Sequence, residues 1–169
     1  MNTLSRNGVL RSGGQVSQAQ LGPNRAAFVL AAAETGGTFS LTEFVMAPPP
    51  APGPPLHRHE DADETVYVLE GALDMTIGER TLSAAPGAVM FVPRGALHGI
   101  SNPGPGATRM LVILTPPGFE GFWREMSALL AGDGAPPSPE MVLALQRKYH
   151  MATAGQARRF DPPVAEHYL

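Results

Sequence analysis

The chain has 169 residues and a net charge of −3 at pH 7; 43% of its residues are apolar and 16% are charged, which predicts a single domain around one core. Because it has no cysteine, disulfides, thiolate metal ligands and cysteine nucleophiles are excluded, and its acidic balance without a basic run argues against a nucleic-acid partner. It has no run of ~20 apolar residues that could cross a membrane and no signal peptide at its start, so we expect a cytoplasmic protein.

Residues 1–24 are rich in Gly, Ser, Gln and Asn and are predicted to form an N-terminal arm, which is too short for a helix-turn-helix. From residue 25 to residue 115, short runs of β-branched, aromatic and apolar residues alternate with Gly and Pro turns. This spacing is typical of an antiparallel sandwich or barrel, so we predict an all-β domain over residues 25–115. The individual strand signals lie at residues 26–30, 38–46, 65–69, 72–77, 80–82, 88–92, 97–101 and 107–115.

A proline-rich run interrupts the strand pattern at residues 47–55. Because its prolines lack amide donors, the run cannot pair inside a sheet, and we predict a stiff, extended surface loop. The alternative interpretation is that the run presets the approach of the chain to the segment that follows, or forms part of a pocket mouth.

Residues 116–169 are predicted to contain two α-helices and a tail, because the apolar period changes there from two to 3.6. Two prolines precede the first helix, and a Ser-Pro pair at residues 138–139 is the expected start of the second. We expect both helices to pack on the outside of the β-domain. The alternative is that aromatic residues of the first helix line a cavity, namely Phe119, Phe122 or Trp123.

Three of the five histidines fall in two segments that point to a metal site. His57 and His59 lie one residue apart on an extended segment, so their side chains share one face of a strand. Glu64 follows after a short acidic turn, and His98 follows a Pro-x-Gly turn farther along the chain. Imidazole and carboxylate together suit a divalent transition metal, whereas an all-oxygen site suits calcium or magnesium. Iron, manganese, nickel, cobalt, copper and zinc all stay open.

The spacing of these residues resembles the two sequence motifs of the cupin family. The second motif, G-x5-PxG-x2-H-x3-N, is matched at every named position over residues 87–102. The first, G-x5-HxH-x3,4-E-x6-G, is matched over residues 57–71, except that three residues instead of five separate Gly53 from the first histidine. The resemblance implies a double-stranded β-helix, or jelly-roll barrel. It also implies metal ligation by His57, His59, Glu64 and His98.

Two assignments rest on the motif spacing. Glu60, Asp61 and Asp63 compete for the place of the acidic ligand, but the spacing selects Glu64. Asn102 completes the second motif, and we expect its amide to brace a turn and not to contact the metal.

The chain is similar to small single-domain cupins related to quercetin dioxygenase. This resemblance implies a metal-dependent dioxygenase that opens the ring of a small enol or aromatic, flavonol-like substrate, with the enolate oxygen of the substrate on the metal. Glu64 would be the catalytic base that takes the hydroxyl proton. One alternative is a non-catalytic protein that binds a metal or a small molecule. The other is a sugar isomerase or epimerase, whose anionic substrate could bind Arg58, Arg80, Arg94 or Arg109.

The quaternary structure is also an expectation from the resemblance. Cupins commonly pair through their barrel edges, and an unpaired strand edge is a liability that a partner strand can cover. An exchange of residues 1–24 between two subunits fits such a pairing. We therefore expect a homodimer, with a small-molecule substrate or ligand and with no nucleic-acid or membrane partner.

Overall fold

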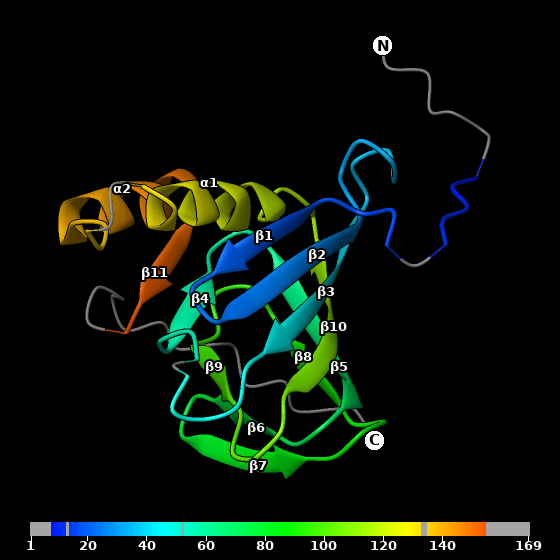
Figure 1. The fold of residues 1–169 in the computed structure, drawn as a ribbon, viewed down its shortest axis with the longest axis vertical. Helices are drawn as coiled ribbons and strands as arrows, with labels where there is room; N and C mark the ends of the chain where they lie inside the picture. The colour runs from blue at the N-terminus through cyan, green and yellow to red at the C-terminus, as the bar shows by residue number, and fades with distance from the viewer. Residues whose placement is uncertain (1–7, 13, 52, 133–134, 155–169) are drawn as a thin grey trace.

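The computed structural model describes residues 8–12, 14–51, 53–132 and 135–154. Its elements in chain order are β1 (Gln18–Leu21), β2 (Asn24–Leu30), β3 (Ser40–Met46), β4 (His57–His59), β5 (Asp63–Glu70), β6 (Leu73–Ile77), β7 (Arg80–Ala84), β8 (Val89–Val92), β9 (His98–Ser101), β10 (Thr108–Thr115), α1 (Glu120–Leu130), α2 (Pro139–Lys148) and β11 (Met151–Thr153). The strands form a six-stranded sheet with the order β1-β2-β3-β10-β5-β8 and a five-stranded sheet with the order β11-β4-β9-β6-β7. Figure 1 shows the two sheets as a sandwich, with α1 and α2 together at one end and β6 and β7 at the other. The all-β fold with two C-terminal helices is therefore confirmed.

The core of the sandwich follows from the alternation of side chains along its strands. In β3 and β10 every second residue is buried, which is the pattern of strands with one face turned inward. The apolar residues on these inward faces include several that are almost completely shielded from solvent: Val66, Val68, Leu73, Met110 and Leu114. Burial of this apolar surface supplies the main favourable term in folding. The same alternation also places three polar residues in the interior: His57 and His59 of β4 and Glu64 of β5.

Three strands lie outside the strand signals given above: β4, whose histidines were expected on an extended segment, and the strands β1 and β11. β1 lies within the segment predicted as an arm and pairs with β2. The backbone amide of Gln20 in β1 also donates a hydrogen bond to Ser127 Oγ of α1 at 3.0 Å. β11 follows α2 directly and pairs with β4, with Met151 opposite His59. The predicted tail beyond β11, residues 155–169, lies outside the described residues.

The helices pack on the outside of the β-domain, as expected, while aromatic side chains at the start of α1 reach inward. Phe119, which immediately precedes the helix, and Phe122 are each only 8% exposed and belong to the core. Together with Trp123 they line a cavity, as the alternative interpretation predicted. Neither helix in the described part of the chain is both long and apolar enough to cross a membrane.

The proline-rich run is held closely against the end of the sandwich. At its start, the Ala47 amide donates to Asn24 Oδ1 at 3.0 Å. Near its end, Gly53 lies so close to β9 that a Cβ atom there would be 2.5 Å from the Ile100 carbonyl oxygen. Only glycine fits this approach without a shift of the backbone. Residues 48–50 are exposed, as expected for a surface loop, and Pro54 lines a cavity, as the alternative interpretation of a pocket mouth predicted.

Strands β7 and β8 stand at the free edges of the two sheets and expose large apolar side chains. Leu82, Val89 and Phe91 are each at least 60% exposed. Apolar residues on an unpaired edge give a second copy of the chain a surface to cover. The homodimer expected from the sequence stays a prediction.

Asn102 braces two loops at the end of β9, as expected from its place in the second motif. Its Nδ2 donates to the carbonyl oxygens of Ala47 at 3.1 Å and Gly106 at 2.8 Å, and its Oδ1 accepts from the Gly104 amide at 3.0 Å. We predict that Asn102→Ala lowers the free energy of unfolding by about 1–3 kcal/mol, because it removes three hydrogen bonds between a buried side chain and the backbone of the two loops. Urea denaturation measures this change.

The matched control for Asn102 is Ser101→Ala, an exposed neighbour on β9 that should change the unfolding free energy by less than about 0.5 kcal/mol. Metal content should be the same in both variants. Loss of metal from Asn102→Ala without loss of stability would instead assign the amide to the metal site.

Candidate metal centre

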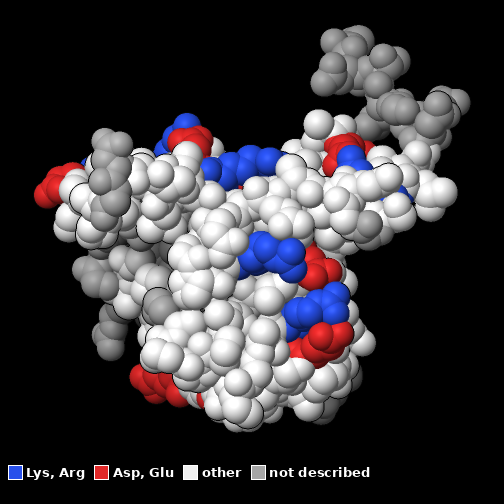
Figure 2. Space-filling view, viewed as in Figure 1, with Lys and Arg blue, Asp and Glu red and all other residues white. Residues whose placement is uncertain are grey.

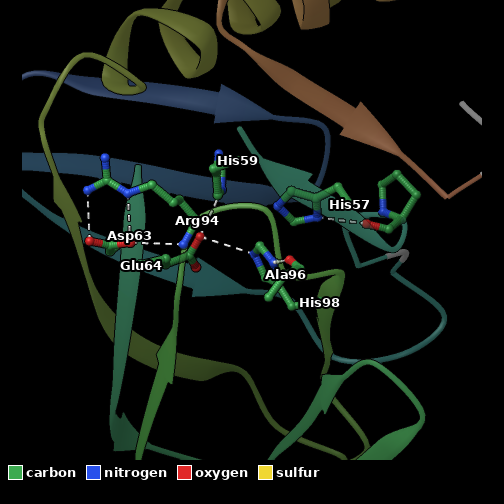
Figure 3. Close-up of polar contacts among 8 residues, drawn as sticks. His57, His59, Asp63, Glu64, Arg94, Ala96 and His98 are labelled. Atoms are coloured by element: carbon green, nitrogen blue, oxygen red, sulfur yellow. Dashed lines mark hydrogen bonds and ion pairs between the residues drawn. The ribbon is translucent and has the colours of Figure 1, made fainter. Parts of the chain in front are cut away.

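Four side chains of the two motifs meet between the two sheets. His57 and His59 lie two residues apart on β4, so both point inward, and they are only 7% and 3% exposed. His98 starts β9, which pairs with β4 so that His98 lies opposite His57. Glu64 comes from β5 of the other sheet and is 7% exposed. The site is thus built from both sheets, with three imidazoles from one and a carboxylate from the other (Figure 3).

The donor atoms of this cluster are close enough to share one ion. One ligand atom from each of the four residues lies within 4.8 Å of all the others. Donors at ~2.0–2.2 Å from an octahedral ion stand about 3 Å apart when adjacent and about 4.2 Å apart when opposite. Glu64 Oε2 lies 2.9 Å from His59 Nε2 and 3.3 Å from His98 Nε2. The cluster therefore has the dimensions and the donor chemistry of a site for a divalent transition metal.

Backbone carbonyls orient two of the imidazoles. Nδ1 of His57 donates to the Pro55 carbonyl at 2.9 Å, and Nδ1 of His98 donates to the Ala96 carbonyl at 3.0 Å. These contacts place a proton on Nδ1 of both rings, so Nε2 is the nitrogen that could bind a metal. At His98 the metal would replace the proton that Nε2 shares with Glu64 Oε2. His59 Nδ1 is buried and has no hydrogen-bond partner among the described residues.

The electrostatics of the cluster suit a cation. Burial, together with the neighbouring His98 and His59, lowers the pKa of His57 to about 3. Burial alone would raise the pKa of Glu64, but hydrogen bonds from His59 and His98 outweigh it and hold that pKa below its usual value. The same balance raises the pKa of His98, because the contact with Glu64 outweighs burial. At neutral pH the site therefore holds a carboxylate and a neutral His57, both of which can bind a metal.

A clamp fastens the loop before His98 to the other motif. Asp63 accepts three hydrogen bonds from Arg94: one from its backbone amide at 2.9 Å and two from its guanidinium at 2.9 and 3.1 Å. This ion pair holds the pKa of Asp63 below its usual value. In addition, the Gly95 amide donates to the His59 carbonyl at 2.6 Å. These contacts fix the positions of Glu64 and His98 relative to each other (Figure 3).

The competing acids lie outside the cluster. Asp63 is engaged with Arg94, Glu60 pairs with Arg58, and Asp61 lies 3.7 Å from His150. The structure thus brings together the four residues that motif spacing selected, and their role as ligands stays a prediction. Sequence reasoning missed the clamp. The available signal was a pair of opposite charges beside the candidate ligands: Asp63 directly before Glu64, and Arg94 inside the Pro-x-Gly turn.

A cavity of about 70 Å³ opens beside the cluster. Its wall is apolar and largely aromatic, and it contains contributions from the proline-rich run, β3, β9, β10, α1 and β11. The residues that complete the wall around the four candidate ligands are Phe44, Pro54, Ile100, Val112, Phe119, Phe122, Trp123 and Met151. Neither Lys nor Arg is among these described residues, so the four candidate ligands are the charged or titratable groups of the wall.

Comparison with known proteins supports the cupin fold. Residues 44–114 match the model of the cupin domain family. No curated protein matches the chain. Among solved structures, the chain is similar to a sugar phosphate isomerase of the cupin superfamily from Silicibacter pomeroyi, with 20% identity over 60% of this chain and 71% of that one and a TM-score of 0.53.

Two further structures have comparable likeness. A predicted oxalate decarboxylase from Thermotoga maritima is 22% identical over 55% of this chain and 80% of that one, with a TM-score of 0.52. The polyketide cyclase RemF from Streptomyces resistomycificus is 27% identical over 60% of this chain and 74% of that one, with a TM-score of 0.52. These names describe different reactions, so the likeness supports the cupin superfamily and leaves the activity open.

The metal site is tested by removing one imidazole. We predict that His98→Ala weakens metal binding by more than ~100-fold. Loss of a residue that only orients a ligand costs ~10–100-fold in metal affinity, and His98→Ala removes a candidate ligand itself. Elemental analysis after purification and competition with a chelator measure this loss. His150→Ala is the control, since His150 is exposed and outside the cluster. Equal metal content in both variants would rule out the site.

The clamp is tested by removing its charge. We predict that Arg94→Gln weakens metal binding by about tenfold without changing the number of ions bound at saturation, because the ligands stay but are held less firmly. Arg80→Gln is the control: it removes an exposed arginine that lines a different cavity. Chelator competition gives both affinities, and wild-type affinity in Arg94→Gln would contradict a role for the clamp in metal binding.

Proposed function

We propose that this protein is a metal-dependent dioxygenase that acts on a small enol or aromatic substrate. The observation that carries the proposal is the junction of two features: the His57, His59, Glu64 and His98 cluster forms one wall of a cavity whose other walls are apolar and aromatic. A flat, weakly polar molecule with one ionisable oxygen suits both parts of this wall.

The cluster would hold the ion, and the remaining side chains would act on the substrate. When bound, the ion would supply Lewis-acid polarisation of the substrate oxygen and a template for the reactants. Glu64, held as a carboxylate at the cavity wall, is placed to accept the hydroxyl proton of an enol. Phe119, Phe122 and Trp123 would exclude water and pack against the faces and edges of a flat ring.

The size of the cavity limits the substrate. An engineered apolar cavity of ~150 Å³ binds benzene, and the cavity beside the cluster measures about 70 Å³. Because this is less than half of the volume that holds benzene, even a single-ring enol requires the wall to adjust, and a three-ring flavonol requires a much larger displacement of the aromatic wall. The proposal accordingly favours the small substrates of the class expected from the sequence.

The wall argues against a sugar phosphate. Such a substrate needs cations near its phosphate, and neither Lys nor Arg is among the described residues of the cavity wall. Arg94 is paired with Asp63, and Arg109 is paired with Glu43 and Glu70. Figure 2 shows basic and acidic side chains side by side on one face, without a patch of a single sign.

A second candidate is cyclisation of a polyenol without dioxygen. It is supported by the 27% identity to the polyketide cyclase RemF, and it uses the same wall and the same carboxylate. The two candidates share a substrate class and differ in their need for dioxygen. A non-catalytic binding protein would show neither reaction.

The proposal is tested by dioxygen uptake and by replacing the candidate base. Protein loaded in turn with each candidate metal should consume dioxygen with a compact hydroxy-enone such as 3-hydroxy-4-pyranone, as an oxygen electrode would record. We predict that Glu64→Gln lowers kcat by about 10²–10⁴-fold, the usual contribution of a general base, while the three histidines retain metal. Glu60→Gln, which removes an exposed neighbouring carboxylate, should be fully active.

The outcomes separate the candidates. Conversion of a substrate without dioxygen uptake would favour the cyclase, and binding without any conversion would favour a binding protein. Full turnover by metal-loaded Glu64→Gln would remove the carboxylate from the mechanism.

A further inference from the structure

A second cavity lies directly behind the aromatic wall. It measures about 210 Å³ and shares two lining residues, His59 and Phe119, with the inner cavity beside the cluster. The rest of its lining comes from the turn before α1, from the loop after β4 and from the end of α2: Asp61, Ala62, Pro116, Pro117, Gly118, Lys148, Tyr149 and His150. Two residues thus lie between the two spaces: His59, which belongs to the cluster, and Phe119, which does not.

The ring of Phe119 is fixed in this position by its neighbours. It meets the edge of His59 at 4.3 Å between ring centroids, stacks on Phe122 at 4.8 Å and meets the edge of Trp123 at 5.2 Å. Gly118, just before it, has φ +131°, a conformation that side-chain-bearing residues rarely adopt. This turn carries the chain from the end of the barrel into α1 with Phe119 directed inward.

The two cavities differ in chemistry. The inner wall is apolar apart from the cluster, whereas the outer one contains Asp61 beside His150 and the Lys148 and Tyr149 pair, both of which bond to Glu125. If the two cavities were joined, they could bind a longer molecule, with a flat apolar part beside the cluster and a polar part in the outer cavity. The partition thus determines the length and the polarity of the molecule that the site can hold.

We propose that Phe119 is a specificity-determining residue, a partition whose ring restricts the site to compact substrates by closing the inner cavity off from the outer one. The assignment of a substrate rests on the proposed function above. The partition itself is a property of the fold and can be measured without turnover.

Size selectivity is tested with two ligands that share a head group. 3-Hydroxy-4-pyranone and 3-hydroxyflavone both present a hydroxyl beside a ketone, but the second is much longer. With zinc-loaded protein, which supports no redox turnover, calorimetry gives the affinity for each. We expect wild type to bind the pyranone, and Phe119→Ala to bind the flavone about tenfold or more tightly than wild type does, a change of ~1.4 kcal/mol.

Phe91→Ala is the matched control. It removes a ring of the same size from the edge strand β8, and Phe91 lines neither the inner nor the outer cavity. The affinity of this variant for the flavone should therefore stay close to wild type. An equal gain in both variants, or no gain in Phe119→Ala, would overturn the partition. Circular dichroism and metal content establish that each variant is folded, and Phe119→Leu replaces Phe119→Ala if the latter does not fold.

The single tryptophan gives a readout that needs neither metal nor substrate. Trp123 lines the inner cavity and not the outer one. Trp123 is half-buried, so acrylamide quenches it to some extent in the wild type. Access through the outer cavity should be added when the partition is gone, so the Stern–Volmer constant should rise in Phe119→Ala and not in Phe91→Ala. An unchanged constant together with unchanged size selectivity would exclude the partition. Failure of wild type to bind the pyranone would count against the proposed function, and the quenching result would then decide the partition alone.

Discussion

The site depends on the burial of one carboxylate among three imidazoles, held between two sheets. Removing a carboxylate from water is costly unless hydrogen bonds and opposite charge compensate it. Here His59 and His98 supply those contacts to Glu64, while His57 is kept neutral by its surroundings. A cation at the centre of the four groups would compensate the carboxylate more completely than the imidazoles do. The two sheets of the sandwich hold the imidazole nitrogens and the carboxylate oxygen within 4.8 Å of one another.

Such a cluster is poorly explained by stability. Replacing buried ionic groups with apolar residues of similar volume is often neutral or stabilising, and the surroundings of the cluster are already apolar. Strongly perturbed pKa values in a buried group beside a cavity are instead typical of functional sites. The Asp63 and Arg94 clamp also favours a functional role for the cluster. An exposed ion pair adds little stability, but this one joins the two segments that carry the candidate ligands.

Much of this arrangement could be predicted from local rules. Strand alternation places His57 and His59 on one face, and the Pro-x-Gly turn directs His98 inward; both need only neighbouring residues. The pairing of β11 with β4 could not be predicted, and the inward position of Phe119 could be stated only as an alternative, because both depend on contacts between distant segments. A helical period shows that α1 has an apolar face, but it does not show what that face packs against. The clamp is likewise a contact between distant segments; the sequence alone indicates Asp63 only as a competing ligand and Arg94 only as a possible binding residue for an anion.

The donor set and the wall carry different kinds of information about function. Three imidazoles and a carboxylate are compatible with many reactions, and the fold with still more. The wall is what excludes candidates, because a hydroxyl-rich or phosphorylated substrate would leave its polar groups unpaired against phenyl and indole rings. Phe119, Phe122 and Trp123 all come from the chain that follows the barrel, outside residues 44–114 that match the cupin domain. The barrel therefore supplies a cluster whose donor set suits a metal, and under the partition proposed for Phe119 the segment after the barrel determines which molecule can reach that cluster.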